Sequence, residues 1–245
     1  MQNGGLRIRG IIKTSTPEQP LITVVTVVFN GEATLEQTIQ SVVNQTYDNV
    51  EYIVVDGNST DRTLDIIKKY EDRIDYWQSE PDKGIYDAMN KAIDLATGDW
   101  LNFMNVGDTF YSNKVLSKIF GNGEIPYDVI YGNSFCNGNE IKPKSLLKIP
   151  IRMPFCHQAS FVRKSCFDMY KFDLSYKLIA DGVFFYRIKK SRKFNYINEV
   201  ICKYDGSGVS SNQVKVYEER KQFLLAEHKY ILLFIWKLYL QMFKK

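Results

Sequence analysis

The sequence predicts an α/β fold in which a mainly parallel central sheet is flanked by helices. Two observations carry this prediction. Between residues 21 and 104, apolar runs of strand length alternate with segments whose apolar residues recur at helical spacing, and the connections are short. In addition, the first run, Ile22–Val28, contains only isoleucine, valine and threonine, which is typical of a central strand buried on both faces.

The first half of the chain shows the alternation most clearly. The predicted strands are Ile22–Val28, Glu51–Val55, Ile74–Gln78 and Trp100–Met104. The predicted helices are Glu32–Gln45, a helix capped by Ser59 or Thr60 that runs to Tyr70, and Ile85 to about Thr97 with Gly98 as its terminator. This order of elements favours right-handed crossovers within one sheet.

After about residue 110 the periodicity weakens. Here the predicted strands are Asp128–Asn133, Ala159–Arg163 and Asn195–Cys202, and the predicted helix is Ala180–Lys190. We expect this half to complete the same sheet and to add a further layer. Residues 1–20, which end in Pro17 and Pro20, are expected to form a loose arm before the first core element.

The charge of the chain is small and unevenly distributed. The 32 Lys and Arg residues exceed the 28 Asp and Glu residues by four, which is too little to predict a nucleic-acid-binding protein. From Lys203 to the end there are eight basic and four acidic residues, so this segment carries the whole excess and residues 1–202 sum to zero. The net positive charge therefore belongs to the tail.

Cysteine spacing and hydropathy indicate a cytoplasmic protein. The four cysteines form no CxxC pair and have no zinc-type spacing with histidine, so reduced thiols are expected. The N-terminal segment has no apolar stretch of signal-peptide length, and no run of about 18 uncharged apolar residues predicts a transmembrane helix.

Polar residues follow three of the predicted strands at the point where each strand ends. Asn30, Asp56 and Asp108 come after the first, second and fourth strands. In an open α/β sheet, ligands bind outside the carboxyl ends of the strands, so these side chains are expected to converge on a ligand site. Asp56 suits hydrogen bonds to a nucleoside, and Asp108 suits a divalent cation held against a diphosphate.

Two common nucleotide-binding signatures are missing. The turn after the first strand contains Glu32 where a dinucleotide-binding fingerprint needs a glycine, and no P-loop motif is present. The function of a nucleotide-dependent oxidoreductase is therefore disfavoured.

Two long segments show a family resemblance. PLITVVTVVFNGEATLEQTIQSVVNQTYDNVEYIVVDGNSTDRT (20–63) and SEPDKGIYDAMNKAIDLATGDWLNFMNVGDTF (79–110) closely resemble the N-terminal half of family 2 glycosyltransferases of the GT-A fold. Shorter pieces, CHQ (156–158), IAD (179–181) and DGSGVS (205–210), resemble the bacterial polysaccharide branch of that family. The resemblance implies a catalytic domain over residues 21–211, with a Rossmann-like nucleotide-binding half (21–110) and an acceptor half (111–211).

The resemblance also implies roles for individual residues. On the donor side, Phe29 and Asn30 match the turn beside the nucleobase, Asp56 matches the aspartate that bonds uracil in users of uridine diphosphate (UDP) sugars, and Asp82 and Asn90 fall along the nucleotide and donor sugar. The remaining matches are a ligand of Mg²⁺ or Mn²⁺ (Asp108), the general base (Asp181) and contacts to the acceptor or the diphosphate (His157, Gln158 and Ser210).

Two departures and several alternatives accompany these roles. Gly107 stands where many members of the family have a second aspartate, and Gly182 replaces a bulkier residue after the expected base. Without the resemblance, a turn former is the better interpretation of Asp56 and a core histidine that of His157. For Asp181, a solvated helix start remains an alternative to the base. The loop 205–211 is either an ordinary connection or a lid over the diphosphate.

The resemblance implies transfer of a sugar with inversion from a nucleotide diphosphate donor, expected to be a UDP-sugar. The expected acceptor is a hydroxyl of a glycan or a polyprenyl-diphosphate-linked acceptor in cell-surface polysaccharide synthesis. A divalent metal, Mg²⁺ or Mn²⁺, is the implied cofactor. The alternative is a catalytically silent subunit that binds sugar nucleotides or takes part in assembly.

The C-terminal tail, residues 212–245, is predicted to be helical, apolar and basic. Its apolar part, residues 230–243, reaches only about 21 Å as a helix, which is too short to cross a bilayer of about 30 Å. It is expected to dock on the catalytic domain, to pair with a second subunit as a homodimer, or to lie on the inner face of the cytoplasmic membrane with its lysines on anionic lipid. Peripheral membrane contact is the favoured alternative.

Overall fold

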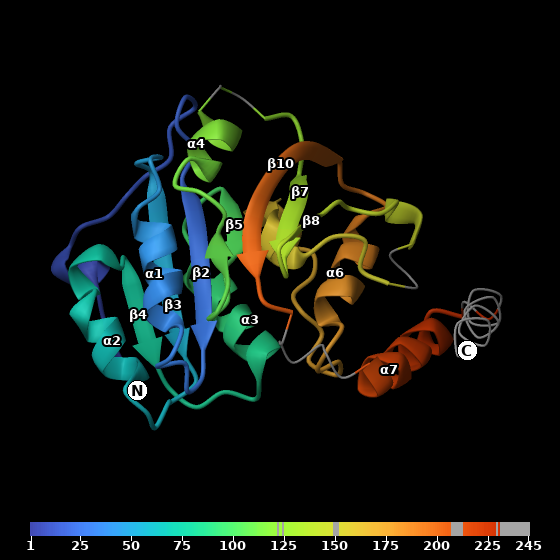
Figure 1. Cartoon of the computed structure of the whole chain (residues 1–245), viewed down its shortest axis with the longest axis horizontal. Helices are drawn as coiled ribbons and strands as arrows, with labels where there is room; N and C mark the ends of the chain where they lie inside the picture. Colours follow the sequence, from blue (N-terminus) through green and yellow to red (C-terminus); the bar gives the residue numbers. More distant parts are fainter. Residues whose placement is uncertain (122, 124, 149–151, 207–212, 229, 231–245) are drawn as a thin grey trace.

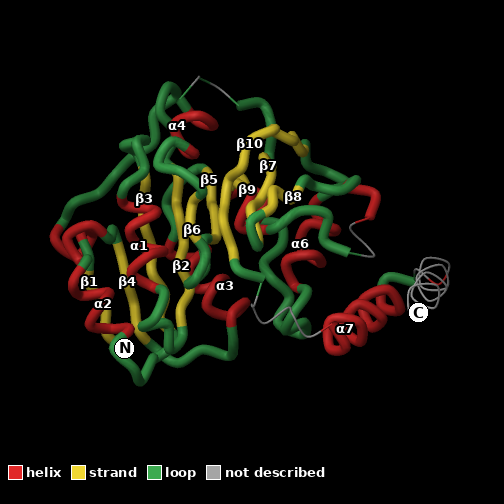
Figure 2. The backbone as a smooth tube through the Cα atoms, viewed as in Figure 1, coloured by secondary structure: helices red, strands yellow, loops and turns green. Residues whose placement is uncertain are grey.

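A computed structural model describes residues 1–121, 123, 125–148, 152–206, 213–228 and 230 of the chain. Within these residues one ten-stranded mixed sheet runs through the molecule, with the order β1-β4-β3-β2-β5-β9-β7-β10-β6 and with β8 paired to β7 (Figure 1, Figure 2). The strands are β1 (Gln2–Gly4), β2 (Ile22–Val28), β3 (Val50–Asp56), β4 (Tyr76–Ser79), β5 (Trp100–Phe103), β6 (Thr109–Phe110), β7 (Val129–Cys136), β8 (Asn139–Ile141), β9 (Ser160–Arg163) and β10 (Phe194–Tyr204).

Helices cover both faces of this sheet. They are α1 (Leu35–Val43), α2 (Thr63–Lys69), α3 (Ile85–Leu95), α4 (Val115–Phe120), α5 (Lys164–Phe167), α6 (Ala180–Ile188) and α7 (Gln213–Ala226). Successive side chains of a strand point to opposite faces. On β2, Val24 and Val28 accordingly pack into the apolar cluster that contains α1, α2 and α4 residues, while Val25 and Val27 pack into the cluster of α3, α6 and α7. The predicted α/β class with helices on both faces is confirmed.

The first half of the sheet is parallel, as predicted. β2 pairs in parallel with β3 on one side and with β5 on the other, and β3 pairs in parallel with β4. All seven residues of β2 and all seven of β3 are buried, so both strands are covered on both faces. The carboxyl ends of these parallel strands therefore lie along one edge of the sheet.

The second half completes the same sheet with mixed directions. β9 lies between β5 and β7 and runs antiparallel to both, whereas β10 is parallel to β7. The four elements predicted in this half are all present, and two strands are longer than predicted, because β7 extends to Cys136 and β10 runs from Phe194 to Tyr204. The last helix, α7, lies at the end of the molecule near α6 (Figure 1).

Two predicted helix boundaries are wrong. α2 begins at Thr63 with Arg62 as the N-cap residue, so neither Ser59 nor Thr60 caps it. α3 ends at Leu95, before the predicted terminator Gly98. That glycine serves a close approach instead, because a Cβ atom there would lie 2.7 Å from the backbone oxygen of Leu21. Polar loop residues that suit helix caps are equally able to bond to neighbouring turns.

The N-terminal residues form ordered structure instead of the predicted loose arm. β1 pairs antiparallel with β4 at the sheet edge, and a 3-10 helix, Leu6–Arg9, follows it. Arg7 bonds to the buried carboxylate of Glu51 at 3.3 Å, and Lys13 bonds to Asp75 at 2.9 Å. Glu51 lies in β3 and Asp75 directly precedes β4, so these contacts attach the segment to the body of the fold.

The C-terminal prediction lies almost wholly outside the described residues, since only residue 230 of the segment 230–245 is described. Over the part of the chain that the structure describes, no helix combines the length and the hydropathy needed to cross a membrane.

Candidate active site

The turns that follow β2 and β3 are bonded to each other at the carboxyl edge of the sheet. The backbone N–H of Asn30 donates to Ser59 Oγ at 2.8 Å, and Asn30 Oδ1 accepts from the backbone N–H of Thr60 at 2.9 Å. Asn30 has a φ of 50° and Asn58 a φ of 66°, a left-handed conformation that asparagine tolerates better than most residues. The side chain of Asn30 therefore holds the two turns together.

Asp56, the last residue of β3, is fully buried. Its carboxylate accepts hydrogen bonds from Ser79 Oγ at 2.6 Å, from Ser59 Oγ and from the backbone N–H of Ser59. These contacts organise the turn after β3 and tie it to the end of β4. In the structure the carboxylate is thus occupied by donors of the chain itself, as expected for a turn former.

Three other features meet beside this turn. Phe29 is 62% exposed, and a Cβ atom at Gly57 would lie 3.4 Å from its ring and 2.5 Å from Asp82 Oδ2. Gly57 thus leaves room between an exposed aromatic face and a carboxylate. Asp82 also accepts from the backbone N–H of Gly84 at 2.7 Å, just before α3. The edge therefore offers a flat apolar surface and a hydrogen-bond acceptor side by side.

Asn90 bonds to the segment before α6. Its Nδ2 donates to the backbone oxygen of Phe172 at 2.8 Å, and its Oδ1 accepts from the backbone N–H of Phe172 at 3.0 Å. Both ends of the amide are thus used to hold this segment against α3. The place of Asn90 along the donor stays a prediction.

Asp108 lies in the loop after β5, where Gln158 Nε2 donates to its Oδ2 at 2.6 Å. Burial, followed by the charge of nearby Asp205, raises the pKa of the Asp108 carboxyl to about 6, although Gln158 and His157 act in the opposite direction. A second carboxylate is therefore close to Asp108, in the DGSGVS motif instead of at position 107. Two carboxylates that repel each other are the kind of site that a divalent cation relieves.

His157 and Asp181 form a pair on the other side of this loop. His157 Nδ1 lies 3.3 Å from Asp181 Oδ2, and the hydroxyl of Tyr86 donates to Asp181 Oδ1 at 2.9 Å. Asn105 Nδ2 lies 3.1 Å from His157 Nε2. His157 and Asp181 are 20% and 14% exposed, so both are largely shielded from water while still accessible. α3, α6 and the 3-10 helix His157–Ala159 position this network.

The two members of the pair shift each other's titration toward the charged forms. Burial lowers the pKa of His157, but the hydrogen bond and the charge of Asp181 outweigh it, and the pKa is raised. Burial raises the pKa of Asp181, yet the bond and charge of His157, with the Gly182 N–H and the Tyr86 hydroxyl, hold it below its usual value. The pair therefore favours an imidazolium beside a carboxylate.

Asn105 is suited to either protonation state of the histidine. Its Oδ1 is buried and has no hydrogen-bond partner within the described residues. As placed, the amide donates to a neutral Nε2; turned over, Oδ1 would accept from a protonated Nε2.

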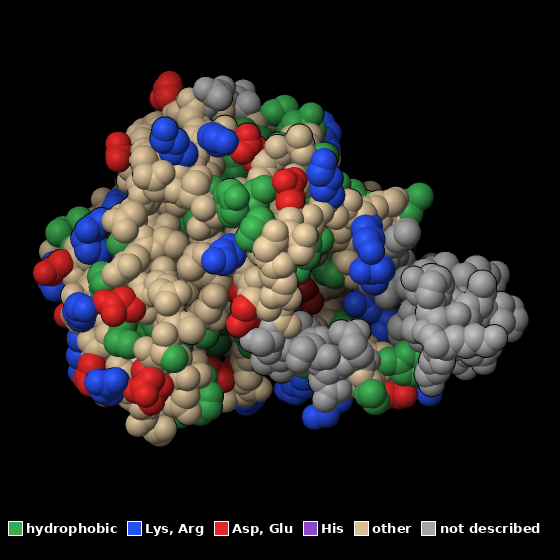
Figure 3. Space-filling view, viewed as in Figure 1, with side chains coloured by type: hydrophobic (Ala, Val, Ile, Leu, Met, Phe, Trp, Pro, Cys, Tyr) green, Lys and Arg blue, Asp and Glu red, His purple; other side chains and the backbone are tan. Residues whose placement is uncertain are grey.

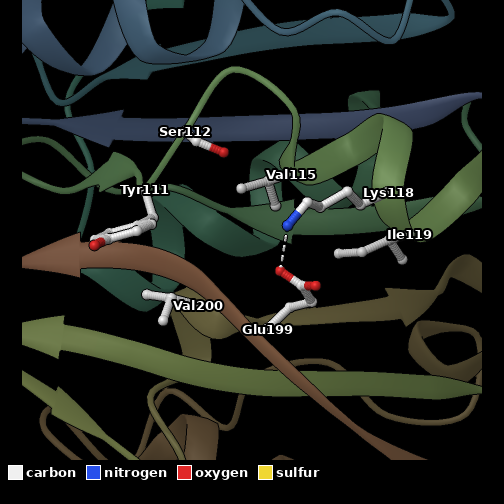
Figure 4. A pocket seen from close by; sticks show the side chains of 7 residues that line it. All are labelled: Tyr111, Ser112, Val115, Lys118, Ile119, Glu199 and Val200. Carbon is white, nitrogen blue, oxygen red and sulfur yellow. Dashed lines mark hydrogen bonds and ion pairs between the residues drawn. The ribbon is translucent and has the colours of Figure 1, made fainter.

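The described residues form one cavity that borders this region and another between α4 and β10. The larger, of about 690 Å³, lies between the start of α3, the segment 174–178 and α7, and Tyr86 is part of its lining. The smaller, of about 300 Å³, lies between α4 and β10, where Lys118 and Glu199 form an ion pair of 2.7 Å (Figure 4). None of the predicted site residues lines the smaller cavity. On the face shown in Figure 3, acidic and basic side chains are interspersed.

Three residues of the site were not predicted. Tyr86 lies in the quoted DKGIYDAMNK segment, Asn105 follows the fourth predicted strand, and Asp205 opens the quoted DGSGVS motif. All three lie in segments that the sequence singles out. Only the fold shows that Tyr86 bonds to Asp181, that Asn105 lies beside His157 and that the charge of Asp205 acts on Asp108. Ser210 lies outside the described residues, as does most of the loop 205–211. Within the described part of the chain no group of three or more metal-ligating side chains occurs.

The architecture and the carboxylates at its edge define a glycosyltransferase of the GT-A fold, as the resemblance implied. Residues 23–194 match the model of glycosyl transferase family 2, and the chain belongs to that family. A relative in Mycobacterium bovis named "PGL/p-HBAD biosynthesis glycosyltransferase" is 30% identical over 206 residues, which cover 80% of each chain.

Two solved structures share the fold at low sequence identity. Staphylococcus aureus TarS 1–349 in complex with UDP has a TM-score of 0.65 and 18% identity over 83% of this chain. The mannosyltransferase PcManGT of Pyrobaculum calidifontis, in complex with GDP-Man and Mn²⁺, has a TM-score of 0.67 and 14% identity over 91% of this chain. This chain spans 64% to 69% of the length of such solved chains.

Proposed function

We propose that the protein is an inverting glycosyltransferase that moves a sugar from a nucleotide diphosphate donor, a UDP-sugar, to a hydroxyl of an acceptor. The observation that carries this proposal is the pairing of Asp181 with His157 beside Asp108. A proton acceptor and a carboxylate suited to a metal thus lie together at the carboxyl edge of the sheet. In α/β sheets of this kind, ligands bind at that edge.

The donor side is supported by the surface at Phe29, Gly57 and Asp82. An exposed aromatic ring offers a stacking face to a nucleobase, and the neighbouring carboxylate offers an acceptor for its N–H or for ribose hydroxyls. Asp56 acts here by shaping the turn, because its own oxygens are engaged by Ser59 and Ser79. The UDP of the TarS complex is the ligand precedent for a uridine nucleotide.

A divalent cation, Mg²⁺ or Mn²⁺, fits the residues at Asp108. Among the described residues, Gln158 alone donates a hydrogen bond to this carboxylate, and the charge of Asp205 lies close by. Hard cations of this kind accept one or two carboxylates together with phosphate oxygens and water. When bound, the cation neutralises charge that builds on the departing diphosphate. The Mn²⁺ of the PcManGT complex is consistent with this assignment.

The chemical step is a direct displacement at the anomeric carbon of the donor. The acceptor hydroxyl gives its proton to the Asp181 carboxylate as its oxygen bonds to that carbon, while the bond from the carbon to the phosphate oxygen breaks and its electron pair leaves with the diphosphate. Tyr86 and His157 each donate to one Asp181 oxygen, and every carboxylate oxygen keeps a second lone pair for the incoming proton. These two side chains orient the base.

The biological setting follows from the same proposal. We infer an acceptor in cell-surface polysaccharide synthesis, a glycan or a polyprenyl-diphosphate-linked glycan, and a cytoplasmic enzyme held against the inner face of the membrane by its C-terminal tail. The excess of basic over acidic residues after Lys203 supports this contact. Pairing of two copies through the tail is its competitor. The domain limits, 21–211 for the catalytic domain and 212–245 for the tail, belong to this proposal.

The test is a screen of purified protein, with Mn²⁺ present, against UDP-, GDP- and dTDP-sugars by thermal shift and donor hydrolysis. We expect metal-dependent stabilisation and slow hydrolysis with a UDP-sugar. Binding without any hydrolysis or transfer would instead support the silent subunit, for which the lone aspartate at Gly107-Asp108 is the argument. An absence of binding to every donor would overturn the proposal.

A further inference from the structure

A cavity between α3 and α7 adjoins the catalytic pair without being part of it. Three segments far apart in the sequence form its walls: the start of α3, the loop before α6 and the helix α7. Its residues that matter here are apolar, namely Ile85, Tyr86, Leu174, Tyr176, Leu178 and Val214. We refer to this cavity of about 690 Å³ as the α3–α7 groove.

One end of the α3–α7 groove reaches the donor edge and its wall reaches the catalytic pair. Gly84 lines the groove, and its N–H bonds to Asp82 at 2.7 Å. Tyr86 also lines it, and its hydroxyl bonds to Asp181 at 2.9 Å. A molecule in this groove would therefore contact Tyr86, the side chain that bonds to the proposed base.

The helix that closes the groove is anchored to the catalytic half. Both carboxylate oxygens of Glu219 accept backbone N–H groups, from Lys177 and Leu178, at 2.8 Å each. Phe223 of α7 packs edge-on against Tyr176 and Tyr186. The groove is thus a built feature of the fold, with α7 held in place on two sides.

The charges around the groove cancel. Its lining includes three lysines, Lys83, Lys177 and Lys215, and three acids, Asp87, Glu218 and Glu219. A site for a polyanionic acceptor would show an excess of positive charge. Apolar residues are exposed in the groove instead: Val214 is 74% exposed and Leu174 is 37% exposed. Mainly apolar cavities of about 300–1,000 Å³ are typical of sites for compact, largely apolar ligands.

We propose that the α3–α7 groove binds a neutral apolar aglycone, an alkyl or aryl group, of the acceptor whose hydroxyl receives the sugar. This inference rests on the proposed function and names the acceptor class for it. Burial of the aglycone against Leu174, Leu178 and Val214 supplies the affinity, and Tyr86 marks the end of the groove nearest to Asp181, the base for the hydroxyl that receives the sugar. Of the acceptors inferred above, this favours a glycan on an apolar aglycone over one carried by a polyprenyl diphosphate.

The experiment compares n-octyl and methyl β-D-glucopyranoside, below the micellar concentration of the former, as ligands of the full chain by isothermal titration. We expect the octyl glucoside to bind about tenfold more tightly or better, because burial of two methylene groups is enough for that factor. The substitutions V214E and L174E should remove most of this difference, since each puts a charge on the apolar surface.

The matched control is L225E, which puts the same charge on the same helix, at a residue that is 40% exposed and does not line the groove. It should keep the octyl preference. Equal affinity for the two glucosides, or equal losses in V214E and L225E, would overturn the proposal and leave the groove to another protein segment or a second copy. Titration with UDP separates the two claims, because failure to bind UDP counts against the proposed function alone.

Discussion

Two aspartates lie at the carboxyl ends of β3 and β5, the two parallel strands on either side of β2, yet their surroundings are opposite. Asp56, at the end of β3, is fully buried and its oxygens accept from Ser59 and Ser79. The carboxylate of Asp108, after β5, accepts one hydrogen bond within the described residues, from Gln158, and its pKa is raised to about 6 by burial and by the charge of Asp205. The chain thus supplies hydrogen-bond donors to the carboxylate of Asp56, whereas burial disfavours the charged form of Asp108.

This contrast extends to the two regions that contain them. In the donor edge, Asn30 and Asp56 bond to nearby turns, so polar side chains there set the shape of the surface. In the catalytic region, Asp108, His157 and Asp181 interact as charged groups with shifted pKa values. Clusters of perturbed titratable groups mark sites of chemistry, whereas saturated hydrogen bonds mark structural roles.

The largest effect is expected at the base. D181N keeps the shape of the side chain but cannot accept the hydroxyl proton, so turnover should fall by about 10²–10⁴-fold. Nucleotide binding should be nearly unchanged, because the donor edge does not contain this residue. The measurements are steady-state transfer with the donor found in the screen and calorimetric titration with UDP.

The matched control for this substitution is D94N. The side chain of Asp94 is 63% exposed, and among the described residues its carboxylate pairs with Lys171. It should transfer sugar at the wild-type rate. Transfer by D181N within a factor of about three of wild type would remove Asp181 from the role of base.

Metal-dependent donor binding should be the next largest effect. Loss of a residue that only orients a metal ligand costs roughly 10–100-fold in metal affinity. Because Asp108 is the proposed ligand itself, D108N should weaken metal-dependent donor binding by more than this factor. In the wild type, Mn²⁺ and a proton compete for the same carboxylate, so the affinity should fall about tenfold per pH unit below pH 6 and level off above it.

This titration requires an intact nucleotide sugar, because the terminal phosphate of a free nucleotide titrates in the same range. The measurement is Mn²⁺-dependent binding of a UDP-sugar at pH 5, 6, 7 and 8. An affinity that is constant between pH 5 and pH 7 would show that the metal does not meet a group with this pKa.

At Asp56 the comparison predicts a loss of stability instead of a loss of chemistry. D56N puts an N–H₂ group where the donors of Ser59 and Ser79 now meet an oxygen. Leaving such buried groups unsatisfied costs about 1–3 kcal/mol in the free energy of unfolding. Urea denaturation measures this change. If stability is unchanged and preference for uridine over guanosine nucleotides is lost, the carboxylate contacts the base, as the family resemblance implied.

Much of the fold was predictable because burial on both faces imposes a strong sequence pattern. The run Ile22–Val28 became β2 without a change of boundary. The position of β9 between β5 and β7 was not predictable, since pairing between distant strands leaves no local signal. Residues 1–20 were misjudged for a related reason: the attachment of Arg7 depends on Glu51, 44 positions away.

The site shows the same division. Asp56 and Asp108 were found because they follow apolar runs, and His157, Gln158 and Asp181 because their motifs resemble a family. The sequence could not show which polar atoms form hydrogen bonds to other residues of the chain. Asn90, which is predicted beside the donor, bonds through both ends of its amide to Phe172. Such local bonds depend on the distance between segments and not on residue type.

The smallest expected effect concerns the stability of the metal-free protein. The pKa of Asp108 is raised in the folded state, so folding favours its protonated form; the associated stability is complete below about pH 4 and is lost as the pH rises through about 6. In the presence of a chelator, D108N should therefore have the same melting temperature as the wild type at pH 4. At pH 8 it should melt about 2–4 °C higher, which corresponds to a gain of about 1 kcal/mol in the free energy of unfolding once access of water is taken into account. The amide oxygen of the new side chain can still accept from Gln158. A melting temperature that falls at pH 8 would mean that Asp108 is satisfied by the fold, as Asp56 is, and the contrast between the two strand ends would disappear.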